Sequence, residues 1–418
     1  MTKEKSTVPR LRFPGFTDAW KPRKLGEVAI SFDYGLNSAA TEYDGENKYL
    51  RITDIDDDSR EFNISNLTSP EINLFGLDEY RLSIGDILFA RTGASVGKSY
   101  IYRSVDGKVY FAGFLIRVKI KDTFNPDFVF QNTLTSNYER FISITSMRSG
   151  QPGVNAQEYS NYEIMFPTLS EQEAIGSFFS DLDQLITLHQ RKLDDVKELK
   201  KALLQKMFPK GNGNDFPELR FPEFTDAWKQ RKLGEVATFA KGNGYSKKDL
   251  VIEGSPIILY GRLYTKYETV ISEVDTFVSV EDNKKSVVYS EGGEVLVPAS
   301  GESSLDIARA SVVAKKGIIL GGDINIIRLH SEIFPVFLAL TISNGKQQKG
   351  LSKRAQGKSV VHLHNSDLKK VDLDFPTLPE QEAIGSFFSD LDQLITLHQR
   401  QLDHLKLLKK ALLQQMFI

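Results

Sequence analysis

The segment Gly93-Ala-Ser-Val-Gly97-Lys98-Ser99 is the part of the chain that looks most able to hold a reactive ligand. Glycine-rich loops of this kind surround phosphates with backbone amides and a lysine ammonium. The nucleotide-binding motif has four residues between its glycines, whereas three separate Gly93 from Gly97, and the Tyr-Ile-Tyr that follows is typical of a strand rather than a helix. We therefore expect no ATP site, but exposed amides beside Arg91 and Lys98 that could meet a nucleic-acid phosphate or a base edge.

Residue types that carry catalysis are scarce in the rest of the chain. The absence of cysteine excludes disulfides, thiolate nucleophiles and thiolate metal sites. Asn125-Pro-Asp-Phe128 is similar to the Asn-Pro-Pro-Tyr/Phe loop of amino-methyltransferases, but Asp127 replaces the second proline and no glycine-rich cofactor turn follows a strand. His189 and His398 have no carboxylate or second histidine at ligand spacing, so we expect packed polar residues rather than metal ligands or a pH switch. The sequence predicts no catalytic, cofactor or metal site in this chain.

Length and composition indicate a globular protein with more than one domain. A chain of 418 residues suggests about two or three domains, and 40% hydrophobic with 26% charged residues is close to the average. No run approaches the roughly 18 apolar residues of a membrane span, and no secretory signal is found, so we expect a cytoplasmic protein. The net charge of −2 and the pI near 6.4 argue against a uniformly basic nucleic-acid binder, but they allow a basic face.

Two segments of the chain occur twice, almost unchanged. One contains tryptophan and ends in Lys-Leu-Gly-Glu-Val-Ala, and the other begins with Phe-Pro-Thr-Leu. The blocks between these repeats show almost no similarity to each other. Neutral sequence change after a gene duplication would alter the repeats and the blocks to the same extent. We therefore expect the repeats to bind identical partners and the blocks to bind different ones. The repeats are residues 11–29 and 219–237, which differ only at Gly15/Glu223 and Pro22/Gln230, and residues 166–208 and 375–417; the blocks are roughly residues 30–165 and 238–374.

The longer repeat predicts a helix of more than 30 residues. Ser170 is suited to cap its start and Glu173 to close a capping box, while Pro379 fits the first turn of the second copy. No proline follows until Pro209 in the first copy, and none in the second. Apolar residues recur at steps of three and four, the spacing of a coiled coil.

One such helix cannot bury its apolar stripe alone, so we predict that the two copies pack together, antiparallel about a pseudo-twofold axis. At about 1.5 Å per residue, about 35 helical residues span roughly 50 Å, more than the roughly 34 Å between DNA half-sites one duplex turn apart. The predicted helix-pair core is Phe179, Leu182, Ile186, His189, Leu193, Val196, Leu203 and Met207, and in the second copy Phe388, Leu391, Ile395, His398, Leu402, Leu405, Leu412 and Met416.

The two blocks are predicted to be mixed α/β, because β-branched and aromatic runs alternate with glycine-containing turns. Residues 83–102 indicate a strand, a tight loop and a strand, and residues 290–310 have the same design. Arginine pairs with guanine and Asn or Gln with adenine, while Lys, Ser and Thr more often bind phosphate. Any one such side chain can be an ordinary solvated group, so clusters are the stronger prediction. The predicted contacts are Arg51, Thr53, Asp54, Arg91, Thr92, Lys98, Arg148, Ser149, Gln151 and Asn155 in the first block, and Tyr260, Arg262, Tyr264, Thr265, Lys266, Ser300, Lys353, Arg354, Gln356, Lys358 and His364 in the second.

The order of these elements resembles the specificity subunit of type I restriction-modification systems. A tryptophan before Lys-Leu-Gly-Glu-Val-Ala, a variable block, then Phe-Pro-Thr-Leu-x-Glu-Gln-Glu-Ala-Ile and a long helix all occur twice. The resemblance extends from Leu11 to Phe417 and includes the Arg-Thr-Gly-Ala-Ser-Val-Gly-Lys and Tyr-Gly-Arg-Leu-Tyr-Thr-Lys-Tyr loops. The second block departs from it with Ser-Gly-Glu-Ser-Ser-Leu-Asp, so a basic contact there is either missing or supplied by Arg309.

The resemblance implies an α+β protein in which two target recognition domains each read one half of a bipartite, asymmetric site on double-stranded DNA. The repeated helices would form an antiparallel coiled-coil spacer and help to dock two modification (methyltransferase) subunits. Those subunits would bind S-adenosylmethionine and methylate adenine at N6, and two restriction (motor) subunits would add cleavage that needs ATP and Mg²⁺. The implied organisation is a first recognition domain at 1–165, a helix at 166–208, a linker at 209–218, a second recognition domain at 219–374 and a helix at 375–418.

Two other functions are compatible with parts of this pattern. A coiled-coil structural or signalling protein without a nucleic-acid partner would suit the pI, but the unlike blocks on like repeats argue against it. An enzyme acting alone lacks support, because no paired carboxylates stand at a convincing spacing. Retention on heparin that falls steeply with salt would separate the DNA-binding function from the first of these.

Overall fold

The computed structural model describes residues 7–209, 216–280, 286–355, 357 and 360–418, which form two compact units. The first unit comprises residues 1–191 and 400–418, and the second comprises residues 192–399. Each unit therefore contains one variable block, the beginning of the long helix that follows that block, and the end of the other long helix. No described helix is both long and apolar enough to cross a membrane.

The first unit is built around a four-stranded antiparallel sheet with the order β2-β9-β6-β7. Every residue of β6 is buried, as expected for a continuous apolar run in a central strand. Shorter two-stranded pairs, β4-β8 and β3-β5, extend this block. Its strands are β2 (Ala29–Tyr34), β3 (Ala40–Glu42), β4 (Lys48–Leu50), β5 (Thr68–Pro70), β6 (Ile87–Ala90), β7 (Ser99–Ile101), β8 (Val109–Phe111) and β9 (Leu115–Ile120), and its helices are α2 (Pro126–Asn132), α3 (Ser136–Thr145) and α4 (Ala156–Ser160).

The second unit contains a five-stranded sheet, β12-β21-β17-β19-β15, and a four-stranded sheet, β13-β16-β14-β20. Residues 290–310, predicted as strand, loop and strand, instead contain β17, the short β18 and α8, and the strand that pairs antiparallel with β17 is β19, which begins just after this region. The strands are β12 (Ala237–Lys241), β13 (Leu250–Val251), β14 (Ser255–Ile258), β15 (Val270–Ile271), β16 (Phe277–Val278), β17 (Val295–Pro298), β18 (Ser300–Gly301), β19 (Ser311–Val313), β20 (Ile319–Leu320), β21 (Ile324–Leu329) and β22 (Val361–His362), and the helices are α7 (Arg262–Thr265), α8 (Ser304–Ile307), α9 (Pro335–Ser343), α10 (Gly345–Arg354) and α11 (Asn365–Leu368).

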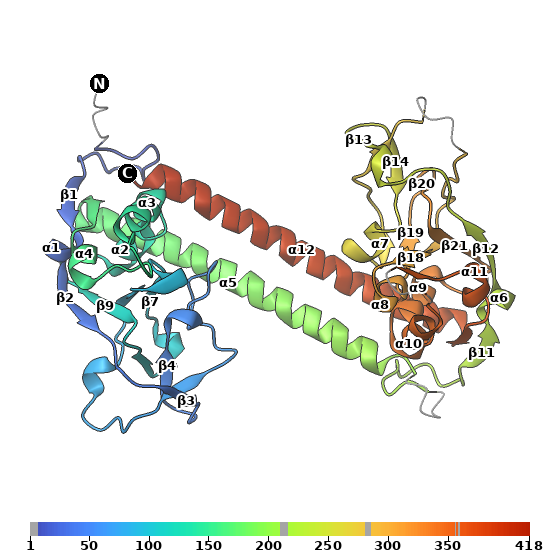
Figure 1. Ribbon diagram of the computed structural model, residues 1–418, viewed down its shortest axis with the longest axis horizontal. Helices are drawn as coiled ribbons and strands as arrows, with labels where there is room; N and C mark the ends of the chain where they lie inside the picture. Colours follow the sequence, from blue (N-terminus) through green and yellow to red (C-terminus); the bar gives the residue numbers. More distant parts are fainter. Residues whose placement is uncertain (1–6, 210–215, 281–285, 356, 358–359) are drawn as a thin grey trace. The chain divides into compact units, whose positions relative to one another are not determined.

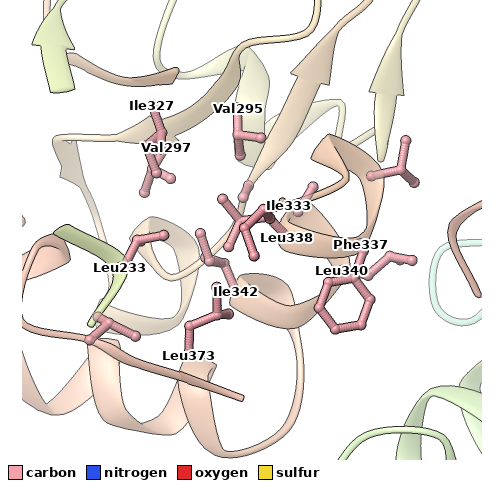
Figure 2. Close-up of a cluster of buried hydrophobic side chains, with 14 of the residues drawn as sticks. Leu233, Val295, Val297, Ile327, Ile333, Phe337, Leu338, Leu340, Ile342 and Leu373 are labelled. Carbon is pink, nitrogen blue, oxygen red and sulfur yellow. The ribbon is translucent and has the colours of Figure 1, made fainter. Parts of the chain in front are cut away.

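Helix α9 lies at the centre of the second unit's core. All residues from Val336 to Ser343 are buried, as is typical of a helix that is apolar on every side. Figure 2 shows Phe337, Leu338, Leu340 and Ile342 of this helix among side chains from β17, β21 and the repeats. The core thus joins the variable block to the repeated elements within one unit.

The shorter repeat forms the same structure in both units. The second half of each copy forms a strand and a one-turn helix, β1 (Lys21–Lys24) with α1 (Leu25–Val28) and β11 (Lys229–Lys232) with α6 (Leu233–Val236). Strand β1 pairs antiparallel with β10 (Glu163–Phe166), and β11 pairs in the same way with β23 (Asp372–Phe375). In each unit the shorter repeat is thereby attached to the strand that leads into the long helix.

The long helices are α5 (Leu169–Lys206) and α12 (Leu378–Met416), with 38 and 39 residues, so the predicted length of more than 30 is confirmed. In the first unit the Phe179 and Phe417 rings lie 5.7 Å apart, and in the second the Phe208 and Phe388 rings lie 6.2 Å apart. In each unit the beginning of one helix therefore packs against the end of the other, and the pair is antiparallel, as predicted (Figure 1).

The predicted helix-pair core is buried or half-buried throughout. Phe179, Leu193, Phe388 and Leu402 are the most enclosed, each at most 1% exposed. The prediction that Ser170 caps α5 is wrong, because the helix begins one residue earlier, at Leu169, and the backbone carbonyl of the preceding threonine accepts hydrogen bonds from the first turn.

Candidate nucleic-acid interface

Two of the predicted contact segments of the first unit are joined by backbone hydrogen bonds. The loop after β6 and the segment before α4 meet where the amide of Gly93 donates to the carbonyl of Pro152 (3.0 Å) and the amide of Val154 donates to that of Arg91 (2.9 Å). Thr92 lies opposite Gly153 in an isolated antiparallel bridge. Residues distant in sequence, 91–98 and 148–155, thus form one polar surface.

The third predicted segment of this block is attached through Lys98. Its ammonium lies 2.5 Å from the Asp57 carboxylate and 3.5 Å from the carbonyl oxygen of Ile55. Residues 51–57, 91–98 and 148–155 are called the first loop cluster below. The structure therefore links the three predicted segments of the first block through the loop of residues 91–98.

The second unit repeats this arrangement with different residues. Strand β18 pairs with β22, and the Ser300 hydroxyl lies 3.0 Å from Nδ1 of His362. The amide of Leu363 donates to the carbonyl of Ala299 (3.0 Å), as Val154 does to Arg91 in the first unit. His364 is the N-cap residue of the one-turn helix α11, as Asn155 is of α4.

The loop that contains Tyr264 also belongs to this surface. Burial is the main reason why the pKa of Tyr264 is raised, and the carboxylates of Glu302 and Asp306 raise it further. Residues 260–266 therefore lie beside the loop that follows β17. Residues 260–266, 299–306 and 361–364 are called the second loop cluster below.

Most predicted cations of the first loop cluster are paired with carboxylates. Arg51 lies 2.8 Å from Asp54, and this hydrogen bond raises the pKa of the Arg51 guanidinium. Arg148 lies 2.5 Å from Glu158. Arg91 differs, because its guanidinium carbon lies 4.9 Å from the centre of the Tyr34 ring and none of the described carboxylates pairs with it.

Arg262 ties the loop of residues 260–266 to the chain that follows it. Its side chain is only 8% exposed and forms ion pairs of 2.6 Å with both Glu268 and Asp275. Lys266 pairs with the same aspartate at 2.7 Å, and this hydrogen bond is the main reason why the pKa of Asp275 is lowered.

The other predicted contacts are more accessible. Lys353 and Arg354 are exposed at the end of α10, which packs against α8, whereas Gln356 and Lys358 lie outside the described residues. Exposed or half-buried within the two clusters are Thr53, Ser149, Gln151, Tyr260 and Thr265.

In the segment that resembles a phosphate loop, the backbone amides already donate hydrogen bonds to nearby carbonyls of the same chain. Those of Val96, Gly97 and Lys98 donate within the loop and to Ala90, at 3.0–3.1 Å. A Cβ atom at Gly97 would lie 2.6 Å from Ile142, so packing as well as its positive φ favours glycine there. These amides serve the turn and are not available to a phosphate.

Asn125 has a structural function. Its side chain accepts a hydrogen bond from the amide of Phe128 (2.9 Å) and so caps α2. The described residues contain no group of three or more His, Asp or Glu side chains suited to a metal ion.

Arg309, considered above as a substitute basic contact, faces a different surface. Its guanidinium lies 5.4 Å from the centre of the Tyr267 ring and lines a cavity of about 270 Å³ together with Lys200 of α5. Neither Ser300 nor His362 lines this cavity.

Three residues of these surfaces were not predicted from the sequence. Tyr34 and the exposed Phe114 lie beside Arg91, and His362 lies opposite Ser300. The alternation in Val-His-Leu-His could have indicated that His362 shares a strand face with the predicted His364. Nothing local in the sequence connects Tyr34 with Arg91.

Two unlike polar loop clusters on two nearly identical repeats define a recognition protein with two modules. The family model of the type I restriction modification DNA specificity domain matches residues 17–198 and again residues 225–407. The chain therefore belongs to the family of type I restriction-modification DNA specificity proteins, and it is the DNA specificity subunit of such a system. The predicted family, duplicated α+β fold and specificity function are confirmed, and the coiled-coil signalling alternative is set aside.

Individual relatives agree with this assignment. The MjaVIII specificity subunit of a type I restriction enzyme from Methanocaldococcus jannaschii is 21% identical over 339 residues, which cover 78% of this chain and 77% of the relative. The MjaIX specificity subunit from the same organism is 20% identical over 317 residues, which cover 71% and 69%. The crystal structure of the S subunit from the M. genitalium type I system has a TM-score of 0.67 at 14% identity, over 98% of this chain and 99% of that chain, and shows the same fold.

Proposed function

We propose that this subunit binds a bipartite, asymmetric site on double-stranded DNA, with one loop cluster reading each half. The observation that carries the proposal is the pairing of like repeats with unlike clusters. Corresponding backbone hydrogen bonds build both clusters, but Arg91 and Thr92 in the first correspond to Ala299 and Ser300 in the second. Two surfaces with the same backbone arrangement but different side-chain donors and acceptors are suited to two different base sequences.

The repeats offer a matching pair of surfaces for two identical partners. Leu185 and Leu188 on α5 are 46% and 45% exposed, and Leu394 and Leu397 at the same positions of α12 are 43% and 49% exposed. Exposed apolar groups of this kind commonly mark protein interfaces. We assign these leucines to the docking of two modification subunits, one on each helix.

The chemistry of the complex then belongs to the partner subunits. The modification subunits would bind S-adenosylmethionine and methylate adenine at N6 within the site. Two restriction subunits would use ATP and Mg²⁺ to cleave unmodified DNA, and all of these steps would take place in the cytoplasm. This chain contributes the choice of sequence and the positions of its partners.

The proposal is tested by exchanging one block. Residues 30–165 are replaced by the corresponding block of another specificity subunit, the chain is expressed with the modification subunit, and methylated adenines are mapped across the genome. We expect one half of the recognised site to change and the other half, together with the gap, to stay the same.

A matched exchange of residues 238–374 serves as the control and should alter the other half only. If either exchange alters both halves, or neither, the modular function proposed for the two clusters is wrong.

A further inference from the structure

Arg91 is distinguished from the other cations of the first loop cluster by its partner. Arg51, Lys98 and Arg148 each contact a carboxylate within 2.8 Å, and those carboxylates take up some of their N–H donors. Arg91 instead lies over the face of Tyr34, with 4.9 Å between the guanidinium carbon and the ring centre, and no described carboxylate pairs with it. A ring attracts the cation through its face and leaves the N–H donors at the guanidinium edge free.

The surroundings fix Arg91 in place. Its amide donates to the carbonyl of Phe114 (3.0 Å), and its own carbonyl accepts from the amide of Val154 (2.9 Å). Tyr34 is also held, because its hydroxyl accepts a hydrogen bond from the amide of Ala156 (3.3 Å) at the start of α4. A side chain that is ordered before binding loses less conformational entropy when it meets a ligand.

A guanidinium with free donors can bind two acceptors side by side, which on DNA are O6 and N7 of guanine or two phosphate oxygens. The neighbouring groups favour the base. Phe114, whose carbonyl accepts from the Arg91 amide, is 59% exposed, and the other predicted cations of the cluster already contact carboxylates. Such a partly apolar, nearly neutral surface is better suited to base edges in a DNA groove than to the phosphate backbone.

We propose that Arg91 reads a guanine in the first half of the DNA site and that Tyr34 is its positioning residue. This inference rests on the proposed function and makes it specific. The second cluster lacks an equivalent arginine, because Ala299 takes the same place. The amide of Ala299 donates to the backbone carbonyl of Asp323 (2.8 Å), its carbonyl accepts from the amide of Leu363 (3.0 Å), and it is 2% exposed. The guanine contact made in this way therefore belongs to the first half-site alone.

The test uses the full chain with its modification subunit and maps the methylated motif for the wild type, Arg91→Ala, Arg91→Lys and Arg140→Ala. In Arg91→Ala we expect one guanine of the first half-site to become degenerate, with about 5- to 150-fold less discrimination against other bases there. Arg91→Lys keeps the charge but not the planar pair of donors, so it should also lose discrimination. Arg140 is an exposed arginine on α3 and serves as the control.

Tyr34 has its own pair of variants. Tyr34→Phe keeps the ring and should keep discrimination at the guanine, whereas Tyr34→Leu removes the ring and should weaken it. The readout is the ratio between matched and mismatched sites, which a purely structural role would not change. Continued recognition of the second half-site shows that each variant is folded.

Several results would overturn the inference. A motif that Arg91→Ala leaves unchanged, or a first half-site without guanine, contradicts base reading. Equal weakening on all sequences, with a shallower salt dependence and rescue by Arg91→Lys, would show a phosphate contact instead. If the wild type and Arg140→Ala also yield no methylated motif, the proposed function itself is wrong, and the result says nothing specific about Arg91.

Discussion

The two loop clusters have corresponding backbones and different chemistry. In the first, Arg91 stands over a tyrosine ring at the end of β6, and in the second a buried alanine takes its place and the next residue, Ser300, faces His362. Corresponding backbone hydrogen bonds hold each pair of segments and do not depend on which side chains are present, and in the second cluster the Ser300–His362 contact adds to them. A fold built in this way can change what it recognises without losing the surface that does so.

The largest effect on the free energy of unfolding is expected in the repeats, where the two units should behave alike. Glu171 is fully buried and accepts two hydrogen bonds from Arg12 (2.6 and 2.7 Å), and Glu380 accepts two from Arg220 (both 2.6 Å). Removing either carboxylate leaves an arginine without its partner, so Glu171→Ala and Glu380→Ala should each lower the free energy of unfolding by about 3–5 kcal/mol.

Chemical denaturation of the full chain measures these losses. Glu173→Ala, at an exposed position two residues away, is the control and should change stability little. A large loss for one copy and a negligible loss for the other would show that the two repeats are not energetically equivalent.

A smaller effect is expected at the exposed leucines of the helix pair. Leu188→Glu or Leu397→Glu should weaken binding of one modification subunit by about 30-fold, because a charge replaces an apolar contact at the proposed interface. Native mass spectrometry should then show one bound modification subunit in place of two. Leu305→Glu alters a leucine that is 57% exposed and lies in the second loop cluster, outside the repeats, and it should leave two modification subunits bound. Loss of both subunits from a single substitution would contradict separate docking surfaces.

The smallest effect is expected for arginine substitutions within the two clusters. The stability that each substitution costs should depend on how deeply the ion pair is buried. Arg262 is 8% exposed and binds two carboxylates, whereas the Arg51 side chain is 33% exposed and binds one. Arg262→Ala should therefore cost about 1.5 kcal/mol of unfolding free energy. Arg51→Ala should cost at most about 0.5 kcal/mol, and added salt should reduce that cost. Equal costs would mean that burial does not distinguish these pairs.

The long helices show how far local sequence information reaches. Apolar residues at steps of three and four, without an interrupting proline, predicted α5 and α12 and the side chains that they bury. The exact start was missed at Ser170, since several neighbouring residues can cap a helix and small differences in backbone hydrogen bonding decide between them. The connection that contains α8 was also missed, because its short turn has no clear period.

By itself the sequence determined the duplication, the antiparallel helix pair and the family, because repeats and periodicity are written along neighbouring residues. It could not rank the predicted cations, since Arg51, Arg91, Lys98 and Arg148 look equivalent in the chain. The folded structure pairs Arg51 with Asp54, only three residues along the chain, and Arg148 with Glu158, and only the tertiary structure brings Asp57 to Lys98 and the ring of Tyr34 to Arg91. Ion pairs and ring contacts act over a few ångströms of space, and residues far apart in the sequence come that close only after folding.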